Sequence, residues 1–509
     1  MKQGIPLEIG EIIVKLQKAG FEAYVVGGCV RDLLLSREPE DWDVATSATP
    51  KEVQKVFPDS FYENKFFTVT VRTKSQDPKL KEIEVTSYRS DLRYGDRRHP
   101  EEVQYAKTIE EDLARRDFTV NAIALVLKSK IQNPKSKTNS NSQNTKYKIL
   151  DTKYELVDPF DGRKDLKAKL MRAVGAPEAR FQEDALRMMR GVRLCATLGF
   201  SLEPETKEAI AKNASLLKEI SQERIRDEFV KIIMAEKARE GVETLRELGL
   251  LDFIIPELVE GYGVTQNKHH IYTVWEHNLL SLGYAVKQKW SFEIRLASLL
   301  HDVGKPRVKK GEGKDSTFYG HEVVGSRMAK QILSRLKFPQ KTIEKIGTLV
   351  RYHLFYYNVG EVSEASIRRL VKNVGPENVE DLLKVRMADR IGSGVPKAEP
   401  YKLRHLKYLI DKVAQDPISP KMLKVKGDDV MRMLGMGPGP TIGWILDALL
   451  AAVLEDPQKN EKDILTQYVK ELGGLPQEKL CAISKKAEQE RENVQTKRDE
   501  MTKQKYWIT

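Results

Sequence analysis

The stretch at residues 24–44 reads Tyr24-Val25-Val26-Gly27-Gly28-Cys29-Val30-Arg31-Asp32 and, further on, Asp41-Trp42-Asp43-Val44. The apolar run before the two glycines predicts a strand, and the segment after them predicts a helix. Glycines at such a junction let backbone N–H groups approach an anion closely, and the helix N-terminus favours negative charge. Alternate residues of a strand share one face, so Asp41 and Asp43 can point into one site.

Two carboxylates on one face repel each other unless a cation lies between them. Hard oxygen ligands suit Mg²⁺, which also takes phosphate oxygens from a substrate. Gly27, Gly28 and Arg31 then provide a place for those phosphates. An isolated Asp-x-Asp or Gly-Gly pair is usually only a turn, and it is their order that favours nucleotidyl transfer.

Composition limits the class of protein. The chain has 509 residues, 40% hydrophobic and 31% charged, with a net charge of +12, which favours a polyanionic partner. The three cysteines follow no metal or disulfide spacing, and we find no signal peptide and no apolar run of membrane-spanning length. We therefore expect a cytoplasmic protein that does not contact membranes.

Two further segments carry residues that fit a nucleotide site. Glu84 lies in an alternating strand pattern and is a candidate third catalytic carboxylate, although a solvent-facing glutamate explains the spacing equally well. Farther along, Arg116 is a candidate contact for the triphosphate and Asp117 for a ribose hydroxyl.

Residues 181–190 contain no helix breaker, so we expect a helix that continues to Gly191. Asp184 and Arg187 would be neighbours on it, and Arg190 and Arg193 continue the three-residue spacing. A structural salt bridge is one interpretation. The other is base selection, because a carboxylate beside a guanidinium complements the amino donor and ring-nitrogen acceptor that cytosine and adenine share.

These motifs, in this order, resemble those of the class II CCA-adding tRNA nucleotidyltransferases and bacterial poly(A) polymerases. Residues 223–229, Glu223-Arg224-Ile225-Arg226-Asp227-Glu228-Phe229, complete the set. The resemblance implies Mg²⁺-dependent, template-independent addition of C, C and A to the 3′ end of tRNA from CTP and ATP. It assigns Gly28 and Arg31 to the nucleotide, Asp41 and Asp43 to the metal, Arg116 to phosphates, and the four residues of the 184–193 segment to the base pocket.

Variants of this activity remain open on sequence grounds. Poly(A) polymerases of the family carry a basic pair after the metal motif, and residues 63–69 lack it. Residues 89–100 resemble the loop that A addition requires, which favours the full CCA reaction over CC-only enzymes. The sequence departs from the family at Phe67, where glycine is usual. A catalytically silent RNA-binding protein is the alternative of another class.

A second group of residues lies farther along the chain. His301-Asp302 ends an apolar helical segment, where buried charge is costly unless it is paired or bound to metal. With His277 and Asp389 the pair resembles the four ligands of the HD metal-dependent phosphohydrolases, and His321 and His353 are candidates for a second metal or for phosphate. The resemblance implies a divalent metal of unspecified identity and phosphohydrolase activity. The domain could instead only hold tRNA, or its site could be the principal activity.

The predicted fold is an α+β nucleotidyltransferase head with a mixed sheet, followed by all-α domains. The expected boundaries are 1–165 for the head with a flexible insertion at 131–147, 166–264 for a helical neck and body, 265–395 for the HD domain, 396–476 for a helical tRNA-binding tail, and 477–509 for a charged tail. The last segment is expected to be a solvated helix or a frayed end.

Overall fold

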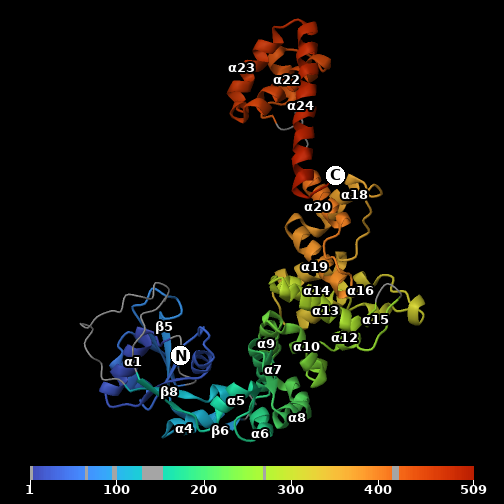
Figure 1. The fold of residues 1–509 in the computed structure, drawn as a ribbon. Coiled ribbons are helices and arrows are strands. Elements are labelled where there is room, and N and C mark those ends of the chain that lie inside the picture. The colour runs from blue at the N-terminus through green and yellow to red at the C-terminus, as the bar shows by residue number, and fades with distance from the viewer. Residues whose placement is uncertain are drawn as a thin grey trace. The chain divides into compact units, whose positions relative to one another are not determined.

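A computed structural model describes residues 4–63, 67–94, 100–128, 153–267, 271–414 and 423–508. The insertion predicted at 131–147 lies outside these residues. The chain divides into two compact units, one formed by Met1–His353 with Asp381–Val395 and the other by Leu354–Glu380 with Pro396–Thr509. The expected fold class is confirmed, because strands and helices are followed by helices alone (Figure 1).

The first unit begins with a mixed sheet of seven strands in the order β3-β4-β5-β2-β1-β8-β9. Strands β2 and β5 are parallel, and the other neighbouring pairs are antiparallel. The strands are β1 (Ala23–Val26), β2 (Asp43–Thr46), β3 (Ser60–Glu63), β4 (Thr68–Arg72), β5 (Glu82–Ser87), β8 (Ala124–Lys128) and β9 (Lys153–Val157). A separate hairpin pairs β6 (Arg89–Tyr94) with β7 (Pro100–Tyr105).

The two faces of the sheet pack differently. On one face, Val44 packs in a large apolar cluster with residues of α1 (Leu7–Lys18), α2 (Gly28–Leu34) and α3 (Pro50–Val56). On the other, Val26 and Ala45 pack against Leu113 of α4 (Ile109–Ala114). Because strand residues alternate, Asp43 lies on the α4 face with Ala45.

Helices make up most of the rest of the first unit. Beyond α5 (Gly162–Ala168), the short strands β10 (Leu170–Met171) and β11 (Ser201–Leu202) form a parallel pair. The next helices are α6 (Pro177–Glu183), α7 (Leu186–Leu198), α8 (Pro204–Asn213), α9 (Gln222–Met234), α10 (Ala238–Glu247), α11 (Leu251–Ile254) and α12 (Pro256–Val259). They are followed by α13 (Val274–Lys287), α14 (Phe292–Leu300), α15 (Lys305–Val308), α16 (His321–Arg335), α17 (Gln340–Tyr352) and α19 (Val379–Gly392).

The prediction of one unbroken helix that runs to Gly191 is wrong. Helix α6 ends at Glu183, Asp184 has extended backbone dihedrals, and α7 begins at Leu186 and continues through Gly191 to Leu198. No glycine or proline marks the break. The Asp184 side chain stabilises it by accepting a hydrogen bond from the Leu186 amide at 3.1 Å, as a residue before a helix often does.

The second unit contains α18 (Glu364–Val374), α20 (Tyr401–Ala414), α21 (Gly427–Leu434), α22 (Pro440–Glu455), α23 (Lys462–Gly473) and α24 (Gln477–Lys505). The charged segment after residue 476 is helical, as one of its two expected forms had it, but the expectation that it is solvated is wrong at its N-terminal end. Leu480 of α24 is buried in one apolar cluster with Ile445 of α22 and Leu465 of α23, and the Ser484 hydroxyl donates to Asp447 at 3.0 Å.

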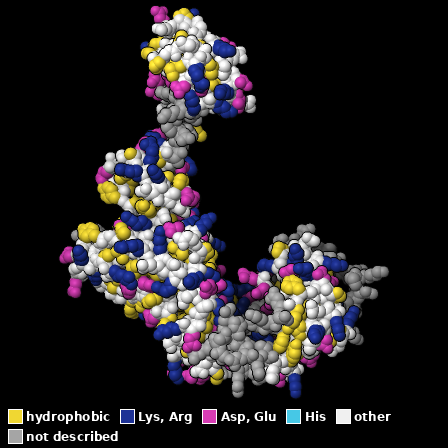
Figure 2. Space-filling view, turned by 180° about the vertical axis from the view of Figure 1, so that it is seen from behind, with side chains coloured by type: hydrophobic (Ala, Val, Ile, Leu, Met, Phe, Trp, Pro, Cys, Tyr) yellow, Lys and Arg dark blue, Asp and Glu magenta, His cyan; other side chains and the backbone are white. Residues whose placement is uncertain are grey.

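Surface charges of both signs are mixed on the face of the molecule shown in Figure 2. No helix among the described residues has the length and apolar character needed to cross a bilayer.

Candidate active and metal sites

Three carboxylates lie near one another at the start of β2. Asp43 is the first residue of β2 and lies directly opposite Glu84 of β5 in the parallel ladder, and Asp41 precedes it by two residues. Burial raises the pKa of Asp43 to about 6, and the negative charges of Asp41 and Glu84 add to this effect while Arg116 opposes it. The carboxylates repel one another without a cation, and oxygen donors of this kind suit a hard divalent metal. In the part of the chain that the structure describes, the sets of three ligand atoms within 4.8 Å of one another belong to the second centre, so Asp41, Asp43 and Glu84 would have to draw together around an ion.

The turn between β1 and α2 brings backbone and positive charge to the same place. Gly27 has a φ of +82°, and a Cβ atom there would lie 2.9 Å from Arg116 Nη1 and 3.4 Å from Asp43 Oδ2. Only glycine suits this conformation and this close approach. Arg31 points back across Gly28 and is held by Asp32 at 2.9 Å and by the Asn121 side-chain oxygen at 2.8 Å.

Arg116 is fixed by a buried residue that the sequence analysis did not single out. Asp112 of α4 accepts from Arg116 Nη2 at 3.2 Å and from Arg115 Nη2 at 2.8 Å, and its side chain is 1% exposed. Burial opposes its ionisation, but the two guanidinium groups outweigh that and lower the pKa of Asp112. The spacing of three and four residues along α4 could have indicated these pairs.

Asp117 and Arg190, predicted as separate contacts of the nucleotide, bind each other. Arg190 Nε donates to Asp117 Oδ2 at 2.8 Å, and the Asn121 amide donates to Asp117 Oδ1 at 3.1 Å. Although burial opposes it, these contacts hold the pKa of Asp117 well below its usual range. Arg193, one turn on, pairs with Glu228 of α9 at 3.2 Å.

The two predicted base-reading residues have strong partners of their own. Arg224 of α9 donates to Asp184 Oδ2 at 2.8 Å, while Arg187 donates to Glu183 at 2.6 Å and to the Arg115 carbonyl at 3.2 Å. Arg224 lies in the motif at residues 223–229 but was given no role from sequence. The contacts fix both side chains in place independently of a nucleotide.

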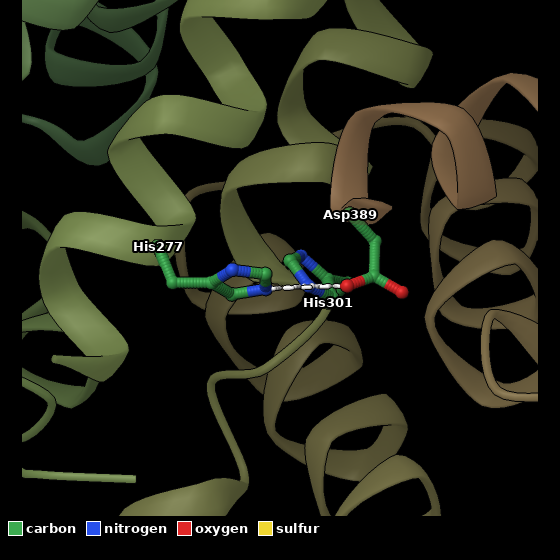
Figure 3. A group of neighbouring side chains, drawn as sticks. All are labelled: His277, His301 and Asp389. Atoms are coloured by element: carbon green, nitrogen blue, oxygen red, sulfur yellow. Dashed lines mark hydrogen bonds and ion pairs between the residues drawn. The ribbon is translucent and has the colours of Figure 1, made fainter. Parts of the chain in front are cut away.

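The second centre is built from the ends and interiors of helices. His277 lies in α13, His301 directly follows α14, and Asp389 lies in α19. His277 Nε2 is 2.8 Å from His301 Nε2 and 3.4 Å from Asp389 Oδ1, and these three side chains point toward one another (Figure 3). Each of the three is buried.

Asp302 connects this group to two more histidines. Its Oδ2 atom is 3.1 Å from His277 Nε2, and its Oδ1 atom is 3.3 Å from His321 Nε2 and 3.6 Å from His353 Nε2. His321 begins α16 and His353 follows α17. All six histidine and aspartate residues proposed from sequence therefore meet in one place.

Three of the imidazoles each have a second partner of the same kind, a backbone carbonyl three residues earlier in the chain. A carbonyl only accepts, so Nδ1 carries a proton, and in the neutral, metal-binding form of each ring Nε2 presents a lone pair toward the centre. The pairs are His301 with Ser298 at 2.8 Å, His321 with Phe318 at 2.7 Å and His353 with Val350 at 2.7 Å.

Converging lone pairs and carboxylates fit a metal. Two sets of atoms lie within 4.8 Å of one another, one from His277, His301 and Asp389 and one from His301, Asp302 and His353. Carbonyl-bound imidazoles with aspartates are typical ligands of a catalytic transition-metal or Mg²⁺ site. Without a cation, burial lowers the pKa of His301, but Asp302 and Asp389 outweigh burial and raise it to about 10.

Two glycines allow the helices to approach closely enough to form this centre. A Cβ atom on Gly392 of α19 would lie 2.2 Å from Ser281 Oγ and 2.8 Å from the His277 carbonyl. A Cβ atom on Gly304 would lie 2.4 Å from the His321 carbonyl. Neither contact can be relieved by a flexible side chain alone, because backbone atoms are involved in both.

Basic residues around this centre were not predicted. Lys305 Nζ lies 2.6 Å from Asp302 Oδ2 and donates to Gln266 at 2.7 Å, and Arg386 Nη1 lies 2.6 Å from Asp389 Oδ2. Arg386 and Asp389 lie three positions apart on α19, so helical spacing could have indicated that pair, whereas Asp302 and Lys305 are joined by the turn between α14 and α15.

Three family models match segments of the chain, and two of those segments contain the two centres. Residues 23–172 match the family described as Poly A polymerase head domain, residues 199–261 match Probable RNA and SrmB-binding site of polymerase A, and residues 274–392 match HD domain.

The chain also resembles whole proteins. It is 32% identical over 467 residues to the CCA-adding enzyme of Geobacillus stearothermophilus, covering 90% of this chain and 95% of that one. It is 35% identical over 358 residues to the A-adding tRNA nucleotidyltransferase of Deinococcus radiodurans, covering 68% and 75%. The crystal structure of the Bacillus stearothermophilus CCA-adding enzyme in complex with CTP is 29% identical, with a TM-score of 0.51 and coverage of 91% and 96%. The chain therefore belongs to the tRNA nucleotidyltransferase family that contains the CCA-adding enzymes.

Proposed function

We propose that this protein adds C, C and A to the 3′ end of tRNA from CTP and ATP without a nucleic-acid template. The observation that carries the proposal is the meeting of Asp41, Asp43 and Glu84 beside Gly27 and Arg116. A relative with which the chain aligns over 95% of that relative's length is a CCA-adding enzyme, which supports the same reaction.

The head residues have distinct parts in the reaction. Asp41 and Asp43 would hold Mg²⁺, with Glu84 beside them, and the bound metal would activate the tRNA 3′-hydroxyl and neutralise the leaving pyrophosphate. Arg116 and Arg31 face the triphosphate, and the glycine turn lets phosphate oxygens approach the backbone. Catalysis then rests on positioning and electrostatic stabilisation, so small displacements of these groups are costly.

Base selection falls to Asp184 and Arg187. The carboxylate accepts from the exocyclic amino group of cytosine or adenine, and the guanidinium donates to the adjacent ring nitrogen. Guanine and uracil present the opposite order. Arg224 and Glu183 hold the two side chains before a nucleotide arrives, so little ordering is left to occur on binding.

Nucleotide incorporation tests the proposal. Radiolabelled tRNA lacking its CCA end is incubated with Mg²⁺ and with CTP and ATP, together and separately, and the products are sized. We expect three additions and then arrest in the wild type, and none with Asp41→Asn. Asp59→Asn is the matched control, because this head residue is 79% exposed at its side chain and lies outside the site.

Addition of A alone is the second candidate, favoured by the similarity to an A-adding enzyme. Incorporation only into tRNA that already ends in CC would establish it. Unlimited addition of A would instead identify a poly(A) polymerase, and no addition would leave an RNA-binding role or the second centre as the principal activity.

We also propose that the histidine–aspartate centre hydrolyses phosphate esters. The observation that favours this is the convergence of His277, His301 and Asp389 in metal-binding geometry, with the positive charge of Lys305 close by. The test is hydrolysis of p-nitrophenyl phosphate and of nucleoside 2′,3′-cyclic phosphates with Mg²⁺, Mn²⁺, Co²⁺ or Ni²⁺. His301→Ala should abolish it, whereas His405→Ala, a histidine of the second unit, should not.

A further inference from the structure

Phe67 occupies a backbone conformation that suits glycine. Its φ is +55°, in the left-handed region, and it directly precedes β4. A side chain with a Cβ atom is strained there, and a bulky one especially so. Such strain is kept where the surrounding structure enforces it, and it is concentrated at functional sites.

The strained residue has a specific partner. The Phe67 ring stacks on the ring of Tyr105, with centroids 4.4 Å apart and planes 14° from parallel. Tyr105 is 51% exposed and is the last residue of β7, where it pairs with Arg89 of β6. A half-exposed stack gains about as much free energy as the left-handed backbone costs, so the pair adds little net stability.

The stack joins the base of the β6–β7 hairpin to the catalytic strand. The Phe67 carbonyl accepts from the Ser87 amide of β5 at 3.0 Å, and the Thr68 and Thr86 hydroxyls lie 3.0 Å apart. Thr86 and Glu84 are alternate residues of β5, so they share the face that carries Asp43. Phe67 therefore holds the hairpin at one end of the catalytic face.

The same hairpin base is held from the other side by the residue that orients Arg116. The Arg89 amide donates to Asp112 Oδ1 at 3.4 Å, and Asp112 Oδ2 accepts from Arg116. The base of the hairpin thus lies between the strand that carries Glu84 and the helix that fixes Arg116. A shift of this base would change the separation of two groups that face the nucleotide.

We propose that Phe67 and Tyr105 are positioning residues for nucleotidyl transfer, in which the stack clamps the base of the β6–β7 hairpin and so fixes Glu84 relative to Arg116. The inference rests on the proposed function of the head. Neither residue touches a reacting atom, and the effect passes through β5 and through Asp112.

Phe67→Gly is the decisive variant, because it removes the ring and also relieves the backbone strain. We expect the melting temperature to stay within about 2 °C of the wild type, since the two effects offset each other. We expect kcat for nucleotide addition to fall by about tenfold with KM for the nucleotide changed less. Amide hydrogen exchange at Tyr105 and Ala106 should become faster by a similar factor.

Matched variants separate positioning from packing. Tyr105→Ala should reproduce the loss of kcat, whereas Tyr105→Phe, which keeps the stacked ring, should keep the wild-type kcat. The double variant Phe67→Gly/Tyr105→Ala should have a kcat no lower than that of either single variant. Phe61→Ala, at a 37% exposed aromatic of the neighbouring strand β3, should change neither kcat nor exchange at the hairpin base.

Wild-type kcat and unchanged exchange in Phe67→Gly would overturn the proposal. Equal kcat losses in Phe67→Gly and Phe61→Ala would also overturn it, because the effect would then not be specific to the stack. If the wild-type protein adds no nucleotide at all, the proposed function fails, and the exchange rates at Tyr105 and Ala106 still decide whether the clamp exists.

Discussion

Replacing Asp43 with asparagine should make the metal-free protein more stable while abolishing nucleotide addition. Burial and the charge of Asp41 raise the pKa of Asp43 from 3.8 to about 6. One pKa unit corresponds to about 1.4 kcal/mol, so ionised Asp43 costs the folded head roughly 3 kcal/mol at pH 7.5 before solvent screening. With screening of this partly exposed carboxylate, we expect Asp43→Asn to stabilise the head by about 2 kcal/mol.

The gain should depend on pH in a defined direction. Because the pKa is higher in the folded state, the folded protein binds more protons between about pH 4 and pH 6, and its stability falls as pH rises through this window. The advantage of Asp43→Asn is therefore complete above pH 6, about half as large at pH 5, and absent below about pH 4.

Hydrogen exchange at the buried Val44 and Ala45 amides in EDTA measures this free energy within the head. Asp59→Asn serves as the control and should leave exchange unchanged. Mg²⁺ should slow exchange in the wild type and not in Asp43→Asn, because bound cation removes the repulsion. A variant no more stable than the wild type at pH 7.5, or a gain that persists undiminished at pH 4, would refute the reasoning.

Three further changes test other parts of the molecule. Arg224→Met frees Asp184, and the preference for CTP over UTP in single-nucleotide addition should fall by about tenfold or more. His301→Ala should abolish metal binding at the histidine centre, measured by calorimetry and elemental analysis, while CCA addition continues at the wild-type rate. Gly392→Ala should weaken that metal binding by at least about tenfold, because the added Cβ displaces α19. Gly443→Ala is the control, since its added Cβ has open space around it and should leave metal binding unchanged. Equal effects of the two variants would contradict the close-packing argument.

Local rules of chain geometry predicted much of the head site. The two-residue period of a strand predicted that Asp41 and Asp43 lie together, but β2 begins at Asp43, so Asp41 lies just before the strand and only its charge is felt by Asp43. The glycine turn could be recognised from its position between strand and helix. The pairing of Asp43 with Glu84 across the two strands could not be predicted in this way. Asp43 meets Glu84 because β2 and β5 pair in parallel, and no short-range pattern contains that register.

The break at Asp184 shows why the base-reading segment was predicted incorrectly. Its sequence has good helical periodicity and lacks glycine and proline, so local propensity favours one continuous helix. The extended residue is stabilised both by the bond that its side chain accepts from the Leu186 amide and, from a distant part of the sequence, by the ion pair with Arg224 of α9. Helix α24 shows the same limit of local sequence patterns. It has few apolar side chains that would predict burial, and those that are buried pack against α22 and α23.

The two centres differ in the donors they offer, and this difference would let one chain load them with different metals. The head presents carboxylate oxygens of Asp41, Asp43 and Glu84, which suit a hard cation such as Mg²⁺ that keeps its waters and takes phosphate oxygens. The second centre presents imidazole nitrogens around Asp302, and such donors bind first-row transition metals more tightly. Lys305 lies against the same carboxylate and lowers the net negative charge that a cation meets. The choice of metal at the second centre therefore depends on the nitrogen donors more than on charge. A metal ion that binds there need not support nucleotidyl transfer in the head.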